Sequence, residues 1–136
     1  MQAQLHLGVE LFDRGEYWHA HEAWEDAWRA DDAPDRDYHK GLIQLAAACW
    51  HLRRGNHKPL AFLLTRARHH LTVHDDARWP FEREALLELI EELADHTDGE
   101  PLPLLGRCRK PGPVPPMAPS PGPDRLRPGV PDTRTG

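Results

Sequence analysis

The chain has 136 residues, of which 17 are basic and 22 acidic, and its formal net charge is −5 at pH 7. This length fits one domain with a core of its own, and the acidic balance argues against nucleic-acid binding, which needs clustered Lys and Arg. The sequence shows neither an apolar run long enough to span a membrane nor the pattern of a signal peptide, so we expect no membrane partner.

The composition changes sharply near the C-terminal end. Residues 101–136 contain 11 of the 14 prolines and five glycines, with little apolar periodicity. Such a segment cannot bury enough surface to offset the entropy lost on ordering. We therefore expect a helical domain over residues 1–98 and a disordered Pro/Gly-rich tail over residues 99–136. Residues 1–100 carry 11 basic and 20 acidic side chains (net −9) and the remainder six and two (net +4), which sum to −5.

The two cysteines, Cys49 and Cys108, do not form the closely spaced, even-numbered framework of a disulfide-stabilised protein. Cys49 falls within an apolar helical arc and is interpreted as a packing residue. Together with the absence of a signal peptide pattern, this cysteine usage predicts a reducing, cytoplasmic location.

Every periodic segment before residue 97 has helical spacing, and none alternates as a strand does. The first helix should span about residues 2–14 and stop at Gly15, a residue suited to helix ends. The second should span about residues 17–30, ahead of Pro34, whose ring disfavours helical geometry in the residue before it. The third should span about residues 38–54.

A fourth helix should follow Asn56, its expected N-cap, and run to about residue 73, with Pro59 in its first turn. After a break at residues 74–79, the fifth helix should begin at or near Pro80. Its acidic side is most simply a solvated face. Short connections favour antiparallel neighbours, so the sequence predicts an all-α, compact bundle of about five helices.

The segment GEYWHAHEAWEDAW contains the candidate site of the second helix. It is close to the zinc-protease signature H-E-x-x-H, but Glu25 stands where that signature needs its second histidine. On a helical wheel, His21 and Glu25 lie one turn apart at the edge of the apolar arc, whereas Glu22 lies further toward solvent. Of the tryptophans, Trp18 and Trp79 are expected to be partly exposed and the others mainly buried.

The third helix is apolar over more than half of its circumference, which predicts a central position. Lys40, Gln44 and His51 interrupt this apolar surface within a stripe of ~40°, with Ala47 and Ala48 on or near it. We expect this stripe to face the polar edge of the second helix.

The two polar edges would then form one partly buried pocket. Its members would be His21, Glu25, Gln44 and His51, with Lys40 and Glu22 at its mouth.

Three interpretations of this pocket stay open. The first is a structural hydrogen-bond network, because buried polar groups must be paired. The second is a divalent metal site (Zn, Fe or Mn) with His21, Glu25 and His51 as ligands. In that case Glu22 would be the general base of a hydrolytic enzyme and Gln44 would orient substrate or water. The third is metal-free acid/base chemistry or the binding of a small ligand.

Two segments, GEYWHAHEAWEDAWR and KGLIQLAAACWHLRRGN, resemble the signature stretches of the domain of unknown function 309 family. The resemblance covers about residues 8–72, and Pro59 departs from the small residue that the family often has near the next helix start. It implies a compact all-α bundle and supplies no biochemical activity. The matching positions are His21, Glu22, Glu25, Trp28, Gly41, Gln44, His51, Gly55 and Asn56.

The sequence thus predicts a helical domain that acts as a binding or interaction module for a small molecule or a protein. The alternative is a metal-dependent hydrolytic enzyme that uses His21, Glu25 and His51. Neither nucleic acid nor a membrane is expected as a partner.

Overall fold

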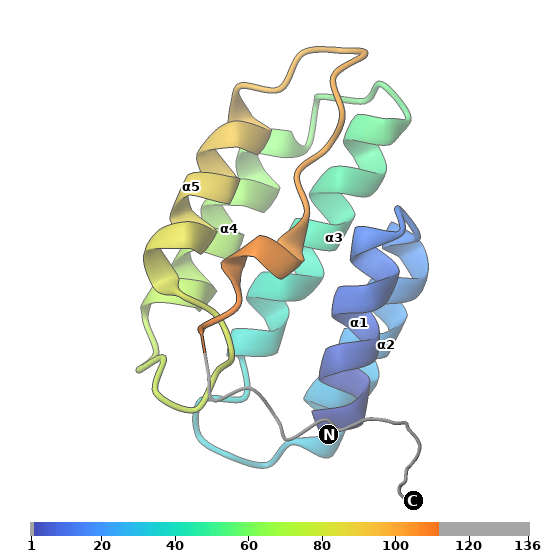
Figure 1. Cartoon of the computed structure of the whole chain (residues 1–136). Coiled ribbons are helices and arrows are strands. Elements are labelled where there is room, and N and C mark those ends of the chain that lie inside the picture. Colours follow the sequence, from blue (N-terminus) through green and yellow to red (C-terminus); the bar gives the residue numbers. More distant parts are fainter. Residues whose placement is uncertain (1, 112–136) are drawn as a thin grey trace, which may run out of the picture.

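A computed structural model of the chain describes residues 2–111 (Figure 1). Within this part of the chain, five α-helices and one short 3-10 helix form, and no strand forms beyond a single bridge between Phe81 and Arg109. The predicted all-α bundle is confirmed. The elements are α1 (Gln2–Asp13), α2 (Tyr17–Ala30), α3 (Tyr38–Arg53), α4 (Leu60–Thr72), α5 (Arg83–Ala94) and η1 (Leu105–Cys108).

Two helices begin later than their sequence signals predict. The Asn56 side chain accepts a hydrogen bond from the backbone N–H of Lys58 at 3.2 Å, which makes a local turn, and α4 starts only after Pro59. The residues before α5 are extended, because the Glu82 N–H donates to the carbonyl of Cys108 at 2.7 Å. None of the helices in the described part of the chain has the length and apolar character needed to cross a membrane.

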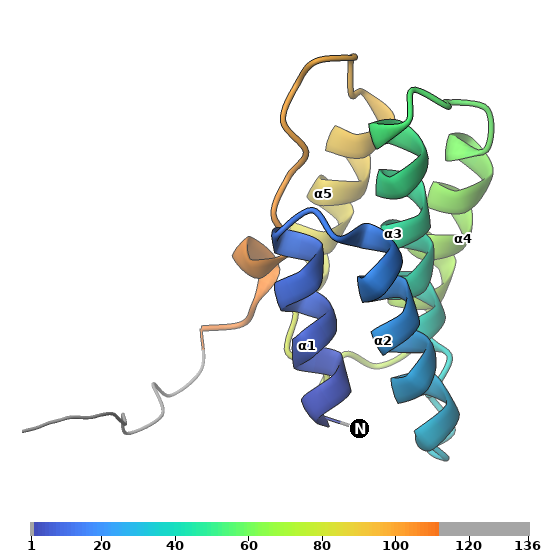
Figure 2. The ribbon, with the colours of Figure 1, turned by 90° about the vertical axis from the view of Figure 1, so that its right-hand side faces the viewer.

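The helices form two layers (Figures 1 and 2). α2, α3 and α4 lie side by side with α3 in the middle, as its apolar surface predicts. α1 packs on α2, α5 packs on α4, and η1 contacts both α1 and α5. These three elements therefore cover one side of the α2–α3–α4 layer, and the core lies between the two layers.

Close packing of helix pairs depends on two glycines. A β-carbon at Gly8 of α1 would overlap the indole ring of Trp24, which is fully buried and donates a hydrogen bond to the Leu5 carbonyl at 3.0 Å. A β-carbon at Gly41 of α3 would press on Leu71 of α4. Small residues at these positions let α1 approach α2 and α3 approach α4 within normal packing distance.

The packed structure extends past the predicted domain end at residue 98. Leu105 and Cys108 of η1 are fully buried, and the Asp13 carboxylate accepts hydrogen bonds from the backbone N–H groups of Leu105 and Gly106 at 2.6 and 3.0 Å. The boundary between residues 98 and 99 is thus too early, since the proline-rich composition obscured two apolar residues that the core takes up. The rest of the expected tail, residues 112–136, lies outside the described residues.

Both cysteines are free thiols enclosed in the core. Burial raises the pKa of the Cys49 thiol far above its ordinary range, and it raises the pKa of Cys108 to about 11. Thiols that stay protonated at neutral pH are poor nucleophiles and metal ligands. Cys49 and Cys108 therefore serve as packing residues.

The contribution of η1 can be tested with two neighbouring leucines. Leu105 is fully buried and Leu104 is 54% exposed. We expect Leu105→Ala to lower the free energy of unfolding by about 2–5 kcal/mol, because it removes buried apolar surface and leaves a cavity. Leu104→Ala should change the free energy by less than about 0.5 kcal/mol. Urea unfolding followed by circular dichroism measures both; equal effects would show that η1 does not belong to the core.

A candidate binding face on α2, α3 and α4

The side of α3 that points away from α1, η1 and α5 is only partly buried. Its side chains recur every three or four residues, so they form one strip along the helix. The strip runs between α2 and α4, which both pack on α3 (Figure 2). We call this strip, with the adjoining edges of α2 and α4, the outer face. The strip consists of Lys40, Ile43, Gln44, Ala47, Trp50, His51 and Arg54.

Aromatic side chains connect α2 with α3 on the outer face. Trp18 is 51% exposed and stacks on His21, with 5.1 Å between ring centroids and 6° between planes. It also leans on Trp50, 5.7 Å away, and Trp50 in turn meets the ring of His51 edge-on at 5.0 Å. The Arg54 guanidinium lies 4.7 Å from the Trp50 ring centroid. This row of rings is held in place yet remains open to solvent at Trp18.

The α4 edge of the outer face combines an exposed aromatic ring with positive charge. Phe62 is 65% exposed, and the Arg66 guanidinium lies 5.4 Å from its ring centroid. Burial lowers the pKa of His70, and the neighbouring His69, Arg66 and Lys40 lower it further, although the Asp37 carboxylate opposes them. The edge therefore has a positive potential that α4 itself does not neutralise.

The predicted pocket residues lie on the outer face, but they do not converge. Only His21 and Glu25 come together, with 3.7 Å between Nδ1 and Oε1, which is too long for a hydrogen bond. His51 Nδ1 instead lies 3.3 Å from the amide nitrogen of Asn56. Within residues 2–111, no hydrogen bond joins Gln44 or His51 to His21 or Glu25. The rings of Trp18 and Trp50 take up the space where the prediction placed a shared pocket.

The other two predicted residues have separate environments. Lys40 lies 5.0 Å from the Trp28 ring centroid and 3.9 Å from a carboxylate oxygen of Asp37. Glu22, the predicted general base, is exposed and lies 3.3 Å from His19. Its position toward solvent agrees with the helical wheel.

The metal interpretation required His21, Glu25 and His51 to reach one ion. Within residues 2–111, no group of three His, Cys, Asp or Glu side chains is placed to hold a metal ion. These three residues therefore do not form the predicted three-ligand set.

Two polar atoms on the outer face are buried and have no hydrogen-bond partner among residues 2–111: His21 Nδ1 on α2 and Gln44 Oε1 on α3. Such atoms cost about 1–3 kcal/mol each when left unpaired, so each one needs an explanation. Because His21 lies under Trp18, a shift of that exposed ring would open Nδ1 to an incoming group. The outer face thus offers hydrogen-bonding capacity beneath its aromatic surface.

A wide groove of about 620 Å³ lies elsewhere, along α5 and the segment that follows it. None of the predicted site residues lines it. Its walls are mainly the exposed carboxylates of α5, and one of them, Glu92, pairs with Arg107. This arrangement agrees with the expected solvated acidic face.

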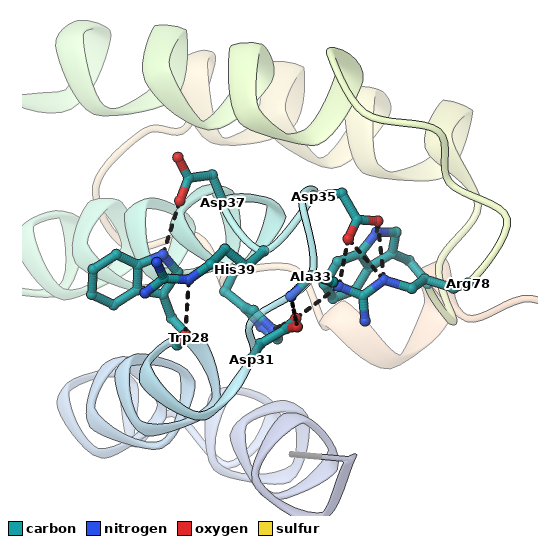
Figure 3. Close-up of polar contacts among 9 residues, drawn as sticks. Trp28, Asp31, Ala33, Asp35, Asp37, His39 and Arg78 are labelled. Atoms are coloured by element: carbon teal, nitrogen blue, oxygen red, sulfur yellow. Dashed lines mark hydrogen bonds and ion pairs between the residues drawn. The ribbon is translucent and has the colours of Figure 1, made fainter.

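A second polar cluster, which the sequence did not predict, links the α2–α3 connection to the α4–α5 connection (Figure 3). The Arg78 guanidinium donates to Asp31 at 2.7 Å and to both carboxylate oxygens of Asp35 at 2.6 to 3.0 Å. Asp31 also contacts His39 Nε2 at 3.0 Å, and Trp79 Nε1 donates to Asp35 at 3.1 Å. Trp79, expected to be partly exposed, is therefore buried.

Burial and hydrogen bonds within this cluster shift the pKa values of Asp31, Asp35 and His39. Burial alone would raise the pKa of Asp31, but hydrogen bonds from Arg78, the Ala33 backbone and His39 lower it below the ordinary range. Hydrogen bonds from Arg78 lower the pKa of Asp35 in the same way. Burial lowers the pKa of His39, although its bond to Asp31 opposes this shift. Because each charged group of the cluster already has a partner within it, we interpret the cluster as structural.

These shifts fix the sign of the pH dependence. The lowered pKa values of Asp31 and Asp35 mean that the unfolded chain takes up protons first as the pH falls, so their stabilisation is present at neutral pH and is lost below about pH 4. The lowered pKa of His39 also makes the protein less stable as the pH falls. This loss begins at a higher pH, about 6.5.

Arg78→Met tests the cluster. We expect a loss of about 3–5 kcal/mol in the free energy of unfolding at pH 7, because two carboxylates lose their cation in a partly buried place. The difference from the wild type should shrink as the pH is lowered toward 4, since protonation relieves the unpaired carboxylates. Urea unfolding at several pH values measures this. Arg68→Met is the control: its partner Glu91 lies 3.9 Å away on the surface, so its loss should stay below about 1 kcal/mol.

Comparison with known proteins gives one match. A family model with the description "Domain of unknown function (DUF309)" matches residues 5–63, which include most of α1, all of α2 and α3, and the start of α4. The match thus includes two of the three helices of the outer face. No curated protein and no solved structure matches the chain. The resemblance inferred from the sequence is confirmed over residues 5–63, where the chain matches the model of the DUF309 family.

Proposed function

We propose that this protein is an interaction module that docks a partner protein on the outer face of the α2–α3–α4 layer. The observation that carries the proposal is the exposure of Trp18 and Phe62 at the two edges of this face, 51% and 65% respectively. Tryptophan, other aromatic residues and arginine are enriched where proteins bind each other, because they bury much area at a small entropic cost. Arg54 and Arg66 lie beside these rings.

The shape of the outer face favours a protein over a small molecule. Small-molecule sites are concave and enclose most of their ligand. Here the strip of α3 lies between α2 and α4, and its residues, among them small Ala47 and branched Ile43, are only partly buried. A helix or a second helical surface can lie along such a strip and reach both aromatic edges at once.

The two unpaired atoms add to this proposal. A partner that displaces the Trp18 ring could exchange a hydrogen bond with His21 Nδ1, and a donor that reaches Gln44 Oε1 would pair the second atom; residues 2–111 provide a partner for neither. Hydrogen bonds formed beneath an apolar rim are a common source of specificity in protein interfaces. The predicted residues His21 and Gln44 thus act in recognition, with Glu25, Lys40 and His51 around them.

Site-specific photo-crosslinking tests the proposal. The full chain is produced in its native host with p-benzoylphenylalanine at position 18 or 62, or at position 7 as the control. Leu7 is also exposed, at 40%, but lies on α1 in the other layer. We expect discrete crosslinked products from positions 18 and 62 and not from position 7, and mass spectrometry then identifies the partner. Absence of products at 18 and 62, or the same products from all three positions, would contradict the proposal.

A further inference from the structure

We propose that the partner on the outer face is a second copy of this chain, so that two copies form a symmetric homodimer. The inference rests on the proposed function, because it requires the outer face to be a docking surface. It adds the identity of the occupant, which follows from the charges at the two edges of the face.

The α2 edge presents a carboxylate toward a partner. The buried residues of α2 fix the rotation of this helix, and with ~100° per residue they leave Trp18 and Glu25 on the side opposite α1. Glu25 is partly exposed and lies 3.9 Å from Arg29 and 3.7 Å from His21. Glu22, further out, adds a second negative charge to this edge.

The α4 edge presents a cation. The buried residues of α4 leave Phe62 and Arg66 on the side opposite α5. Among residues 2–111 Arg66 forms no ion pair, and its guanidinium lies against the Phe62 ring. His69 and His70 lie beside it on the same helix. An unpaired arginine at one edge and carboxylates at the other make the face complementary to itself.

In a dimer with twofold symmetry, this pairing of opposite charges can occur twice, once at each edge of the interface. When the twofold axis lies in the interface and runs parallel to α3, the α2 edge of each copy lies against the α4 edge of the other copy. Glu25 and Arg66 then attract across both edges, and the two α3 strips meet in the middle. A twofold axis perpendicular to α3 would instead set Glu25 against Glu25 and Arg66 against Arg66, which like-charge repulsion disfavours.

The area of the outer face indicates how tightly two copies of the chain should bind each other. Three helices about 20 Å long and 8–10 Å apart present roughly 500–600 Å² per copy. The total of about 1,000–1,200 Å² is at the lower limit of specific interfaces. Trp18 and Phe62 supply the buried aromatic anchors that such a small interface needs. The dimer should therefore dissociate measurably on dilution.

The dimer can be tested by reversing the charge at Glu25 or at Arg66 and then mixing the two variants. Analytical ultracentrifugation of the full chain should show a concentration-dependent equilibrium between one and two copies. Glu25→Arg and Arg66→Glu should each weaken dimerisation by at least about tenfold, because each places like charges at both edges. An equimolar mixture of the two variants should dimerise again, since both edges of the mixed dimer then pair opposite charges. A merely structural effect of either substitution would not be reversed by mixing.

Arg68→Glu is the matched control, because Arg68 lies on the flank of α4 that faces α5, near Glu91. It should leave the dissociation constant unchanged within about twofold. Circular dichroism verifies that each variant is folded. If Glu25→Arg does not fold, Phe62→Ala replaces it, and its folded form should also dimerise at least about tenfold more weakly.

Two results would overturn the dimer: a wild-type chain that stays monomeric at every concentration, or single variants that dissociate while their mixture stays monomeric. The crosslinking experiment separates this failure from failure of the proposed function. A monomeric chain that crosslinks to a different protein through positions 18 and 62 overturns the dimer and leaves the interaction module standing. A monomeric chain that gives no crosslinked product at these positions overturns both.

Discussion

The rest of the structure depends on one cation, the Arg78 guanidinium held between Asp31 and Asp35. These groups lie more than 40 residues apart in the sequence, and their pairing ties the α2–α3 connection to the α4–α5 connection. The same contacts fix the first turn of α3, because His39 is held by Asp31 and Tyr38 stacks on Trp79 with 4.1 Å between ring centroids. Fixing the first turn also fixes the rotation of α3 about its own axis, so only one side of this helix faces outward. The Arg78 cluster at the start of α3 thus fixes which side of the helix belongs to the outer face, as far as Trp50 and Arg54 at its other end.

Local sequence signals account for the helices and for the order in which they follow one another. Apolar spacing identified all five helices, and Gly15 and Gly55 both adopt the positive φ angles that mark helix ends. What could not be predicted depends on contacts between distant segments. The extended residues before α5 pair with the backbone near Cys108, and Leu105 is fixed by Asp13 from the other end of the chain. No pattern within a short window reports such a pairing.

The candidate site was predicted at the level of helix faces and not at the level of contacts. The wheels placed His21, Glu25, Lys40, Gln44 and His51 on surfaces that do adjoin each other. They could not show that Trp18 stacks on His21 and leans on Trp50, because ring positions depend on the distance between α2 and α3. The Arg78 cluster was missed for a related reason: single Asp residues in a connection look like ordinary turn residues until their distant partner is known.

The distribution of paired and unpaired groups favours the outer face over the Arg78 cluster as the place of the proposed recognition. In the Arg78 cluster, one cation is already bonded to both carboxylates, so another molecule would have to break existing bonds to bind there. On the outer face, in the part of the chain that the structure describes, Arg66 forms no ion pair, and His21 Nδ1 and Gln44 Oε1 have no hydrogen-bond partner. A partner that binds there can form hydrogen bonds and ion pairs with these groups without first breaking bonds inside the chain. Exposed rings beside unpaired polar atoms lower the stability of the isolated chain, and association is the physical process that recovers that free energy.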